Sequence, residues 1–322
     1  MTQPSTPPHP VRLPPTMHVI ERDWLSCNQI LLFDEDGGAP AGATLVDSGY
    51  VKHAETTLAL VRHVLSQRGF AQAGLRLLIN THLHSDHCGG NALLAQAFGC
   101  PILVPAAEFE AVARWDEEAL SYTGTSQRCA RFSAAGSLRP GDELTLGGAR
   151  WQVHAAPGHD PHSLILHCPQ HRVLISADAL WENGFGVIFP ELEGESGFEE
   201  QAAVLDLIAT LDVDTVIPGH GRAFGDVPAA IGRARQRLDA MRADPARNAR
   251  NAVRVLIKFL LLDRERMAFE TLAHEMRNAA VMKNAGALIG MDLPQALAWG
   301  VDELERQGQL RREGDLLINQ DP

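Results

Sequence analysis

The sequence predicts an α+β fold: an αββα sandwich of two mixed β-sheets flanked by helices, followed by a mostly helical C-terminal domain. Short apolar runs typical of buried strands occur in two groups, before residue 106 and between residues 143 and 217. In both groups a strand ends in histidine or aspartate residues, as expected at a ligand-bearing sheet edge. Beyond Gly225 the pattern changes to long helical periods, which predicts the separate C-terminal domain.

The periodicity of the apolar residues assigns the individual elements. In the first group we expect strands at residues 28–33, 43–47, 75–79 and 101–105, with helices at 55–67, 91–97 and 106–120. The glycine- and proline-rich segment 34–42 is predicted as the loop between the first two strands. The second group gives strands at residues 143–146, 150–155, 163–167, 173–176 and 214–217, with a helix at 198–211.

The remaining chain is predicted to be helical at residues 228–243, 247–262, 267–278 and 293–307, with a terminal hairpin over 310–318 that turns at Glu313–Gly314. We therefore divide the chain into three parts. These are a proline-rich lead-in (residues 1–17), a sandwich domain (18–225) and a helical C-terminal domain (226–322).

The composition argues against several classes of protein. No apolar run reaches the roughly 18 residues needed to cross a membrane, and the N-terminus lacks a secretory signal pattern. The five cysteines are odd in number and lack Cys-x-x-Cys spacing, so we expect a reduced, cytoplasmic protein. Residues 1–225 carry 13 Lys and Arg against 26 Asp and Glu, and residues 226–322 carry 15 against 14. This acidic balance makes nucleic-acid binding unlikely, because that binding needs a cationic surface.

Four potential metal ligands gather on the turn after the predicted strand at 75–79: His82, His84, Asp86 and His87. This turn lies at the carboxyl edge of a sheet, where the four side chains can converge. His82 and His84 project alike if the strand continues, whereas Asp86 and His87 lie beyond it and can serve a second ion. Imidazole and carboxylate groups are ligands that divalent metals select. The sequence therefore predicts a metal site, since a single core histidine would not explain the clustering.

Residues 81–91 resemble the His-x-His-x-Asp-His signature of the metallo-β-lactamase superfamily, in the form found in glyoxalase II-like hydrolases. The family needs three further ligands downstream. His159, Asp178 and His220 each follow an aliphatic or β-branched run, in the required order. The resemblance covers roughly residues 18–225, which it identifies as a catalytic domain.

This resemblance implies a site for two divalent metal ions, with zinc expected and manganese or iron as alternatives. The first ion would be held by His82, His84 and His159, the second by Asp86, His87 and His220, and both by a bridging Asp178. Two ions about 3.5–4 Å apart share one water and lower its pKa, so that a bridging hydroxide is available at pH 7. Asp86 can accept the proton of this nucleophile, which makes it the expected acid/base residue.

Residues 157–163 depart from the pattern Pro-Gly-His-Thr-Pro-Gly-His-Ser, since this chain has Pro-Gly-His-Asp-Pro-His-Ser, one residue shorter. The ligand His159 is kept, Asp160 replaces the usual hydroxyl residue, and His162 aligns with the second histidine, on the substrate side. Glutathione thioesters are therefore possible substrates but not favoured ones. Asp47, in an early Asp-x-Gly turn, either braces the metal loop or merely reverses the chain.

Aromatic residues after the bridging aspartate are candidates for an apolar acyl pocket. Trp181, Phe185 and Phe189 would line it, although ordinary core packing explains the same residues. Segment 121–136 lacks periodicity and is expected to be a loop that borders the site. Its candidate side chains are Tyr122, Arg128 and Phe132.

The leading hypothesis is a dinuclear, zinc-dependent hydrolase that cleaves a small carboxyl ester, thioester or lactone. One alternative is a phosphodiesterase or nuclease of the same fold, which would require a cationic face on the C-terminal domain. Another is a non-catalytic binding protein on this scaffold, which the complete ligand set disfavours. A di-iron redox protein ranks last, since the sequence contains no flavodoxin-like stretch.

The C-terminal domain resembles the winged-helix-like appendage of some superfamily hydrolases. Acidic Asp302, Glu303 and Glu305 on its last helix disfavour a role in reading DNA. The apolar runs at 253–257 and 259–262 predict burial against the catalytic domain or in a homodimer. A basic patch, Arg233, Arg235 and Arg237, is expected to be a solvated helix face.

Overall fold

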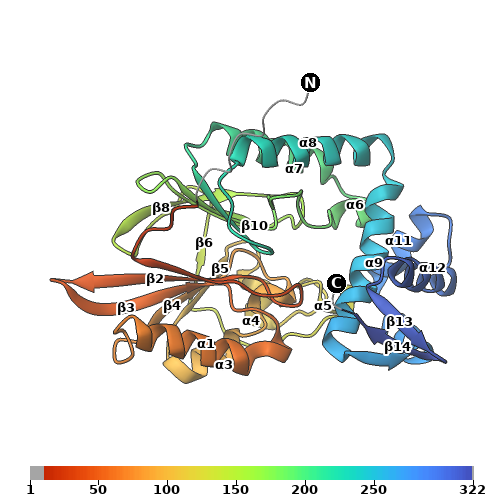
Figure 1. The fold of residues 1–322 in the computed structure, drawn as a ribbon, viewed down its shortest axis with the longest axis horizontal. Helices are drawn as coiled ribbons and strands as arrows, with labels where there is room; N and C mark the ends of the chain where they lie inside the picture. The colour runs from red at the N-terminus through yellow and green to blue at the C-terminus, as the bar shows by residue number, and fades with distance from the viewer. Residues whose placement is uncertain (1–10, 321–322) are drawn as a thin grey trace.

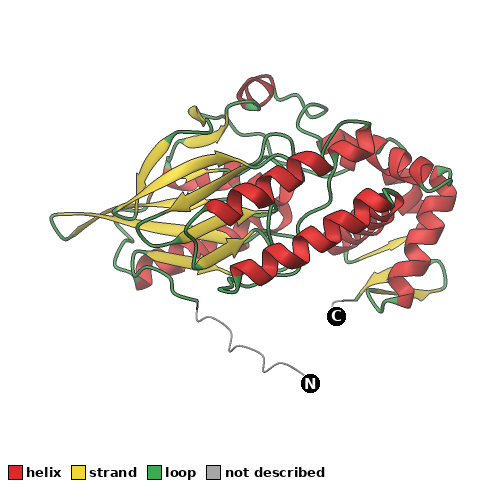
Figure 2. Ribbon diagram, turned by 90° about the horizontal axis from the view of Figure 1, so that it is seen from above, coloured by secondary structure: helices red, strands yellow, loops and turns green. Residues whose placement is uncertain are grey.

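The computed structural model describes residues 11–320, and most of the lead-in predicted for residues 1–17 lies outside them. Two mixed β-sheets stack between outer layers of helices, and a mostly helical region lies at one end of the sandwich (Figure 1). In the view from above, the strands of the sandwich gather at one end and the C-terminal helices at the other (Figure 2). The αββα sandwich and the helical C-terminal region are therefore both confirmed.

The first sheet runs in the order β1 (Met17–Ile20), β2 (Gln29–Asp36), β3 (Ala39–Val46), β4 (Leu75–Ile79), β5 (Ile102–Pro105) and β6 (Gly136–Leu138). Its first three strands pair antiparallel and the others parallel. The second sheet runs in the order β11 (Thr215–Pro218), β10 (Val173–Ala177), β9 (Leu164–Cys168), β8 (Ala149–Ala155) and β7 (Glu143–Leu146). Only the pair β10–β11 is parallel within this second sheet.

Helices cover the outer face of each sheet (Figure 1). On the first sheet these are η1 (Val51–His53), α1 (Ala54–Gln67), α2 (Ser85–Cys88), α3 (Asn91–Phe98), α4 (Phe109–Arg114) and α5 (Tyr122–Thr125). On the second sheet they are α7 (Phe198–Thr210) and α8 (Val227–Ala243), whereas the short α6 (Pro190–Glu193) packs against the C-terminal region. The C-terminal region adds α9 (Ala246–Arg264), β12 (Arg266–Ala268), α10 (Phe269–Met276), α11 (Ala280–Leu288), α12 (Leu293–Arg306), β13 (Leu310–Glu313) and β14 (Leu316–Asn319).

The alternation of side chains along β2 explains how the layers hold together. Leu31 and Phe33 pack into the core between the first sheet and its helices, whereas Ile30 and Leu32 pack into the core between the sheets. A strand whose residues are all apolar is expected when both of its faces are covered. The carboxyl ends of β4, β10 and β11 open toward the C-terminal region, which positions the loops described below.

Two local predictions were wrong. Segment 34–42 is no loop, because β2 and β3 continue into a tight hairpin at Gly37–Gly38, where both glycines have positive φ (57° and 83°). The helix expected over 106–120 shortens to α4 and stops at Trp115, whose φ is +56°. Several further elements were not predicted, among them β1, β6, β12 and α11.

The apolar runs of α9 are buried inside this chain. Val253, Leu256 and Ile257 pack against α11 and α12, and Phe259 packs against Leu25 and Tyr50 of the sandwich. One amphipathic helix therefore joins two cores, and its apolar surface does not require a second copy of the chain. Among residues 11–320, no helix is both long and apolar enough to cross a membrane.

Candidate metal centre

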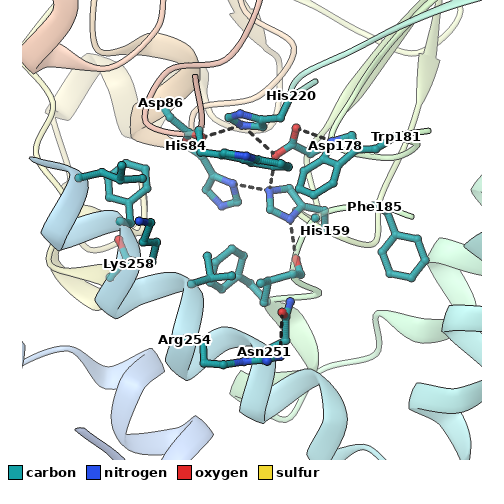
Figure 3. Close-up of a pocket in the computed structure, with 18 of the residues that line it drawn as sticks. His84, Asp86, His159, Asp178, Trp181, Phe185, His220, Asn251, Arg254 and Lys258 are labelled. Atoms are coloured by element: carbon teal, nitrogen blue, oxygen red, sulfur yellow. Dashed lines mark hydrogen bonds and ion pairs between the residues drawn. The ribbon is translucent and has the colours of Figure 1, made fainter. Parts of the chain in front are cut away.

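The side chains expected as ligands meet at the sheet edge that faces the C-terminal region (Figure 3). They come from four loops that follow β4, β8, β10 and β11. These side chains are His82, His84, Asp86, His87, His159, Asp178 and His220. Groups that lie up to 138 positions apart in the sequence are thus brought within a few ångströms of one another because parallel and antiparallel strands end at one edge.

One half of the centre consists of imidazoles. Ligand atoms of His82, His84 and His159 lie within 4.8 Å of one another, and His84 Nδ1 is 2.8 Å from His159 Nε2. All three residues are buried. The carboxylate of Asp178 lies 3.4 Å from His159 Nε2, on the side facing the other half. The arrangement offers three nitrogens and a carboxylate oxygen to one cation.

The other half combines carboxylates and imidazoles. His220 Nε2 is 3.1 Å from Asp86 Oδ2 and 4.0 Å from Asp178 Oδ2, and His87 Nε2 is 3.5 Å from Asp178 Oδ1. Asp178 therefore touches both halves. Gly219 leaves the necessary room, since a Cβ there would lie 2.2 Å from Asp178 Oδ1.

The ligands are held by partners of their own. Asp47 accepts hydrogen bonds from the Thr81 amide (2.9 Å), the Thr81 hydroxyl (2.8 Å) and His87 Nδ1 (2.8 Å). This buried aspartate braces the ligand loop, so it does more than turn the chain. His159 Nδ1 donates to the Val187 carbonyl at 2.5 Å, which leaves its Nε2 for the centre.

Asp160, the residue that departs from the family pattern, lies beside the centre. Its Oδ2 is 3.6 Å from His84 Nε2, the nitrogen that faces away from His159. Its Oδ1 accepts a hydrogen bond from the His162 amide at 2.7 Å, which turns the chain outward. His162 was expected in the substrate pocket and is instead exposed, outside the set of residues that line the cavity.

A divalent cation fits this set of donors. Among residues 11–320, His82 Nε2 and His87 Nε2 are buried and have no hydrogen-bond partner. A buried polar atom without a partner is costly, and these two point among carboxylate and imidazole atoms, where a cation would satisfy both. The donor set of nitrogens and carboxylate oxygens suits zinc and also manganese or iron.

The two halves differ in protonation. Burial, followed by neighbouring imidazoles, lowers the pKa of His82, and burial lowers the pKa of His84 and of His159 to about 4. These imidazoles are therefore neutral at pH 7, as metal ligands must be. Burial acts against protonation of His87 and His220 as well. Cys27 and then Asp178 outweigh it at His87, and Asp178 and then Asp86 outweigh it at His220, so both pKa values are raised. Burial opposes ionisation of Asp178, yet His87 and His220 hold its pKa well below the ordinary value.

A cavity of about 400 Å³ opens above the ligands. Trp181 and Phe189 line it, and so does Phe185, which is otherwise buried in the core of the second sheet. Trp24 stacks on the His220 ring at 5.3 Å and meets Trp181 edge to face at 5.4 Å. The cavity side next to the metal ligands is therefore largely aromatic.

The segment expected to border the site contributes other residues than those predicted. Thr125 and Gln127 line the cavity. Tyr122 and Phe132 are buried in the core of the first sheet, and Arg128 turns away to pair with Asp263 of α9 at 2.7 Å.

Helix α9 forms the far side of the cavity with Arg254, Lys258 and Phe259 (Figure 3). Asn248 at its start exchanges two hydrogen bonds with the backbone of Ile188, at 3.2 and 2.7 Å. Ile188 follows the residue that positions His159, so α9 is fixed to the loop beside the centre. The sequence analysis predicted neither the α9 side of the cavity nor Trp24. The polar residues spaced three and four positions apart along α9 could have indicated the helix side.

The fold and these ligands define a class, the metal-dependent hydrolases built on an αββα sandwich. The model of the metallo-beta-lactamase superfamily matches residues 22–220, which is more than half of the chain. The chain therefore belongs to the metallo-beta-lactamase superfamily.

Relatives and solved structures agree with this placement. An uncharacterized protein of Mycobacterium tuberculosis is 27% identical over 216 residues, 62% of this chain and 88% of that protein. A hydroxyacylglutathione hydrolase of Hyphomonas neptunium is 32% identical over 110 residues, covering 34% of this chain and 36% of the relative. The acyl-coenzyme A thioesterase MBLAC2 of Gallus gallus is 27% identical over 164 residues, covering 46% of this chain and 57% of that relative.

A crystal structure of a beta-lactamase domain protein from Burkholderia ambifaria shares the fold with a TM-score of 0.57 at 23% identity, covering 96% of this chain and 94% of its own. The likeness extends over nearly the whole chain, so the C-terminal region is included in it.

Proposed function

We propose that this protein is a dinuclear metal hydrolase, with zinc as the expected metal, that cleaves a small thioester, carboxyl ester or lactone. The convergence of seven ligand side chains at the base of a cavity carries this proposal, together with two buried imidazole nitrogens that have no hydrogen-bond partner among residues 11–320. The chain spans 36% of the hydroxyacylglutathione hydrolase and 57% of the acyl-coenzyme A thioesterase. The names of these two relatives support the choice of a thioester bond.

In this proposal His82, His84 and His159 would hold one ion and Asp86, His87 and His220 the other, while Asp178 lies beside ligands of both groups. When bound, the ions supply Lewis acidity and an activated water. Asp86 is the acid/base group, because its carboxylate is partly exposed (14%) toward the cavity and can accept a proton at an oxygen. Trp181 donates its indole N–H to Asp178 Oδ1 at 3.2 Å and fixes that carboxylate.

The aromatic side chains around the ligands orient the substrate and exclude water. Trp24 and Trp181 pack against His220, and Phe189 packs against both His84 and His159. An acyl group placed among these rings would bring its carbonyl carbon over the metal ligands. The mostly apolar surface here favours an uncharged acyl chain.

A turnover screen tests the proposal. The zinc- and manganese-loaded proteins would be assayed against panels of thioesters, lactones, β-lactams and phosphodiesters. Turnover of a thioester, ester or lactone, abolished by a chelator and restored by metal, is the expected result. Turnover of phosphodiesters alone would replace this function with the second candidate, which one observation favours: arginines of α8 and α9 line a groove beside the cavity.

Three properties of the whole protein complete the proposal. We propose a winged-helix-like C-terminal module, supported by the sheet order β12-β14-β13 packed on α9 and α12. The acidic residues of α12 pair with Arg306 and Arg312, which leaves little cationic surface on this helix for DNA.

A cytoplasmic location accords with the five free cysteines. Light scattering tests the homodimer that remains a proposal.

A further inference from the structure

A second cavity, of about 500 Å³, lies between α8 and α9. It is lined by Arg233, Gln236, Arg237, Ala240, Met241, Arg247, Asn251 and Arg254, and we call it the arginine groove. Arg237, Asn251 and Arg254 also line the cavity above the metal ligands. The two cavities are therefore neighbours that share one border.

The two helices present these residues on single faces. Arg233 and Arg237 are four positions apart on α8, and Arg247, Asn251 and Arg254 follow at intervals of four and three on α9. Such spacings place side chains on one side of a helix. From Arg247 to Arg254 the α9 stripe extends about 10 Å, at roughly 1.5 Å per residue.

Arg237 occupies a built position at the shared border. Its guanidinium lies over the Phe185 ring at 4.8 Å and donates to the Phe185 carbonyl at 2.9 Å. Gly184 makes room for it, because a Cβ there would lie 2.6 Å from Arg237 Nη1. Burial, and then the charge of Arg254, lower the pKa of Arg237. The chain thus holds two guanidinium groups near each other at an energetic cost.

Carboxylates offset only part of this charge. Arg233 donates to the Glu182 carbonyl at 2.8 Å, and Arg254 donates to the Arg250 carbonyl at 3.3 Å. Of the four groove arginines, only Arg247 forms an ion pair within the described chain, with Asp244 at 3.7 Å. Arg235, on the opposite side of α8, does pair with Asp206 at 2.6 Å. The basic patch expected to be a solvated face is therefore divided: Arg235 is paired with a carboxylate, whereas Arg233 and Arg237 line the groove and form no ion pair among the described residues.

The groove fits phosphate groups better than a single carboxylate. Guanidinium forks bind phosphate oxygens in pairs, and several of them together match a ligand with several negative charges. The metal side of the neighbouring cavity is lined by aromatic rings, which suit an uncharged acyl group better than a phosphate. A substrate that spans both cavities would place a neutral acyl group at the metals and its phosphates at α8 and α9.

We propose that the arginine groove binds the phosphate-bearing end of a thioester substrate, namely the nucleoside diphosphate part of a coenzyme A thioester. This inference rests on the proposed thioester hydrolysis and names its substrate class. The thioester lies at the metal ligands, the linking arm passes Asn251 and Arg254, and the phosphates lie among Arg233, Arg237 and Arg247.

Kinetics with matched substrates form the first test. One acyl group would be presented on coenzyme A, on pantetheine, which lacks the phosphates, and on glutathione. We expect kcat/KM to be at least about 10-fold higher for the coenzyme A thioester than for the other two, as hydrogen bonds to charged groups imply. Arg247→Gln, at an exposed position that is unlikely to affect folding, should reduce this preference, and so should Arg254→Gln. Arg235→Gln is the matched control and should leave the preference unchanged.

Equal kcat/KM for the three thioesters in the wild type would overturn the groove assignment and leave thioester hydrolysis intact. If none of them is turned over, the proposed function fails, and a binding measurement decides the groove separately. Calorimetry would measure the binding of coenzyme A itself to the metal-free protein. We expect binding that weakens with salt and weakens about 10-fold or more in Arg247→Gln, but not in Arg235→Gln. Binding of inorganic pyrophosphate without binding of coenzyme A would also overturn the proposal.

Discussion

The cavity has two unlike sides, which differ in origin, charge and construction. The metal side consists of loops that directly follow strands of the sandwich, and its ligands are buried carboxylates and imidazoles. The helix side consists of α8 and α9, lies beyond the segment matched by the family model, and carries arginines. The metal ligands and the residues that would select a substrate therefore lie in different parts of the chain. The ligands lie within the segment matched by the family model, and the arginines lie on helices that follow it.

The largest effect should come from removing the helix side altogether. Deletion of residues 226–322 exposes the face of the second sheet that α8 covers with Ile231, Ala234 and Leu238. It also removes the partners of Ile188 and Tyr50 on α9. We expect insoluble protein or loss of the cooperative unfolding transition, measured by solubility and thermal denaturation. A soluble, fully active monomer after the deletion would show that the metal side is independent of the helices.

His84→Ala should abolish activity while leaving the helix side in place. Removing a partner of a ligand typically costs 10–100-fold in metal affinity or activity, so removing a ligand should cost more than about 100-fold. Metal analysis of the wild type should find about two ions per chain, and the variant should contain about one. Unchanged circular dichroism serves as the control for folding. No bound metal in the wild type after reconstitution with excess zinc would defeat the hydrolase function.

Asp86→Asn tests the acid/base role on the metal side. The amide keeps the size of the side chain but cannot accept the proton, and general acid–base groups contribute roughly 10²–10⁴-fold to rate. We expect a fall of that order in kcat, with the folded state retained. Metal content must be measured alongside, since an amide is also a weaker ligand. A variant that keeps its metal and a near wild-type rate would show that another group takes the proton.

These predictions differ in how far the sequence supports them. The ligand turn at residues 82–87 is local, and its meaning follows from spacing on a strand-to-helix turn. The pairing of Asp160 with His84 depends on a contact 76 positions apart, and only the structure supplies it. His162 was aligned by the family pattern, but its side chain is exposed to solvent and its amide donates to Asp160. Alignment predicts the ligands here because metal geometry constrains them, whereas loop side chains are free to change.

The fold was predictable for similar reasons. Apolar periods located most strands of both sheets, since burial on each face constrains every residue, but they missed the short edge strands β1 and β6. The hairpin at Gly37–Gly38 and the early stop of α4 at Trp115 were missed because both depend on positive φ, which apolar periodicity does not report. The arginine groove was missed because two separate helices form it. The arginines of either helix, considered alone, are equally consistent with a solvated surface.

Acid should affect the two halves of the metal side differently. The pKa values of His84 and His159 are about 4, so these ligands stay neutral until the pH approaches that value. The pKa values of His87 and His220 are raised, so these ligands take up protons first as the pH falls. Protons compete with metal ions for imidazole. We therefore expect equilibrium dialysis between pH 8 and pH 5 to release one equivalent of zinc before the other. If both zinc equivalents are released at the same pH, the two groups of ligands do not differ in protonation as proposed.

The smallest predicted effect concerns Asp160, which the family pattern would replace with a small hydroxyl residue. Its carboxylate lies 3.6 Å from His84 Nε2 and can hold that ring so that Nδ1 faces the centre. We expect Asp160→Thr to weaken binding of the first metal ion by about 10–100-fold, as loss of a carboxylate partner of a metal-binding histidine does elsewhere. Competition with a zinc-binding dye would measure the change. His162→Ala is the control, since this neighbour is exposed and should leave both affinities unaltered. If Asp160→Thr binds both ions as tightly as the wild type, the carboxylate instead serves the substrate-side loop.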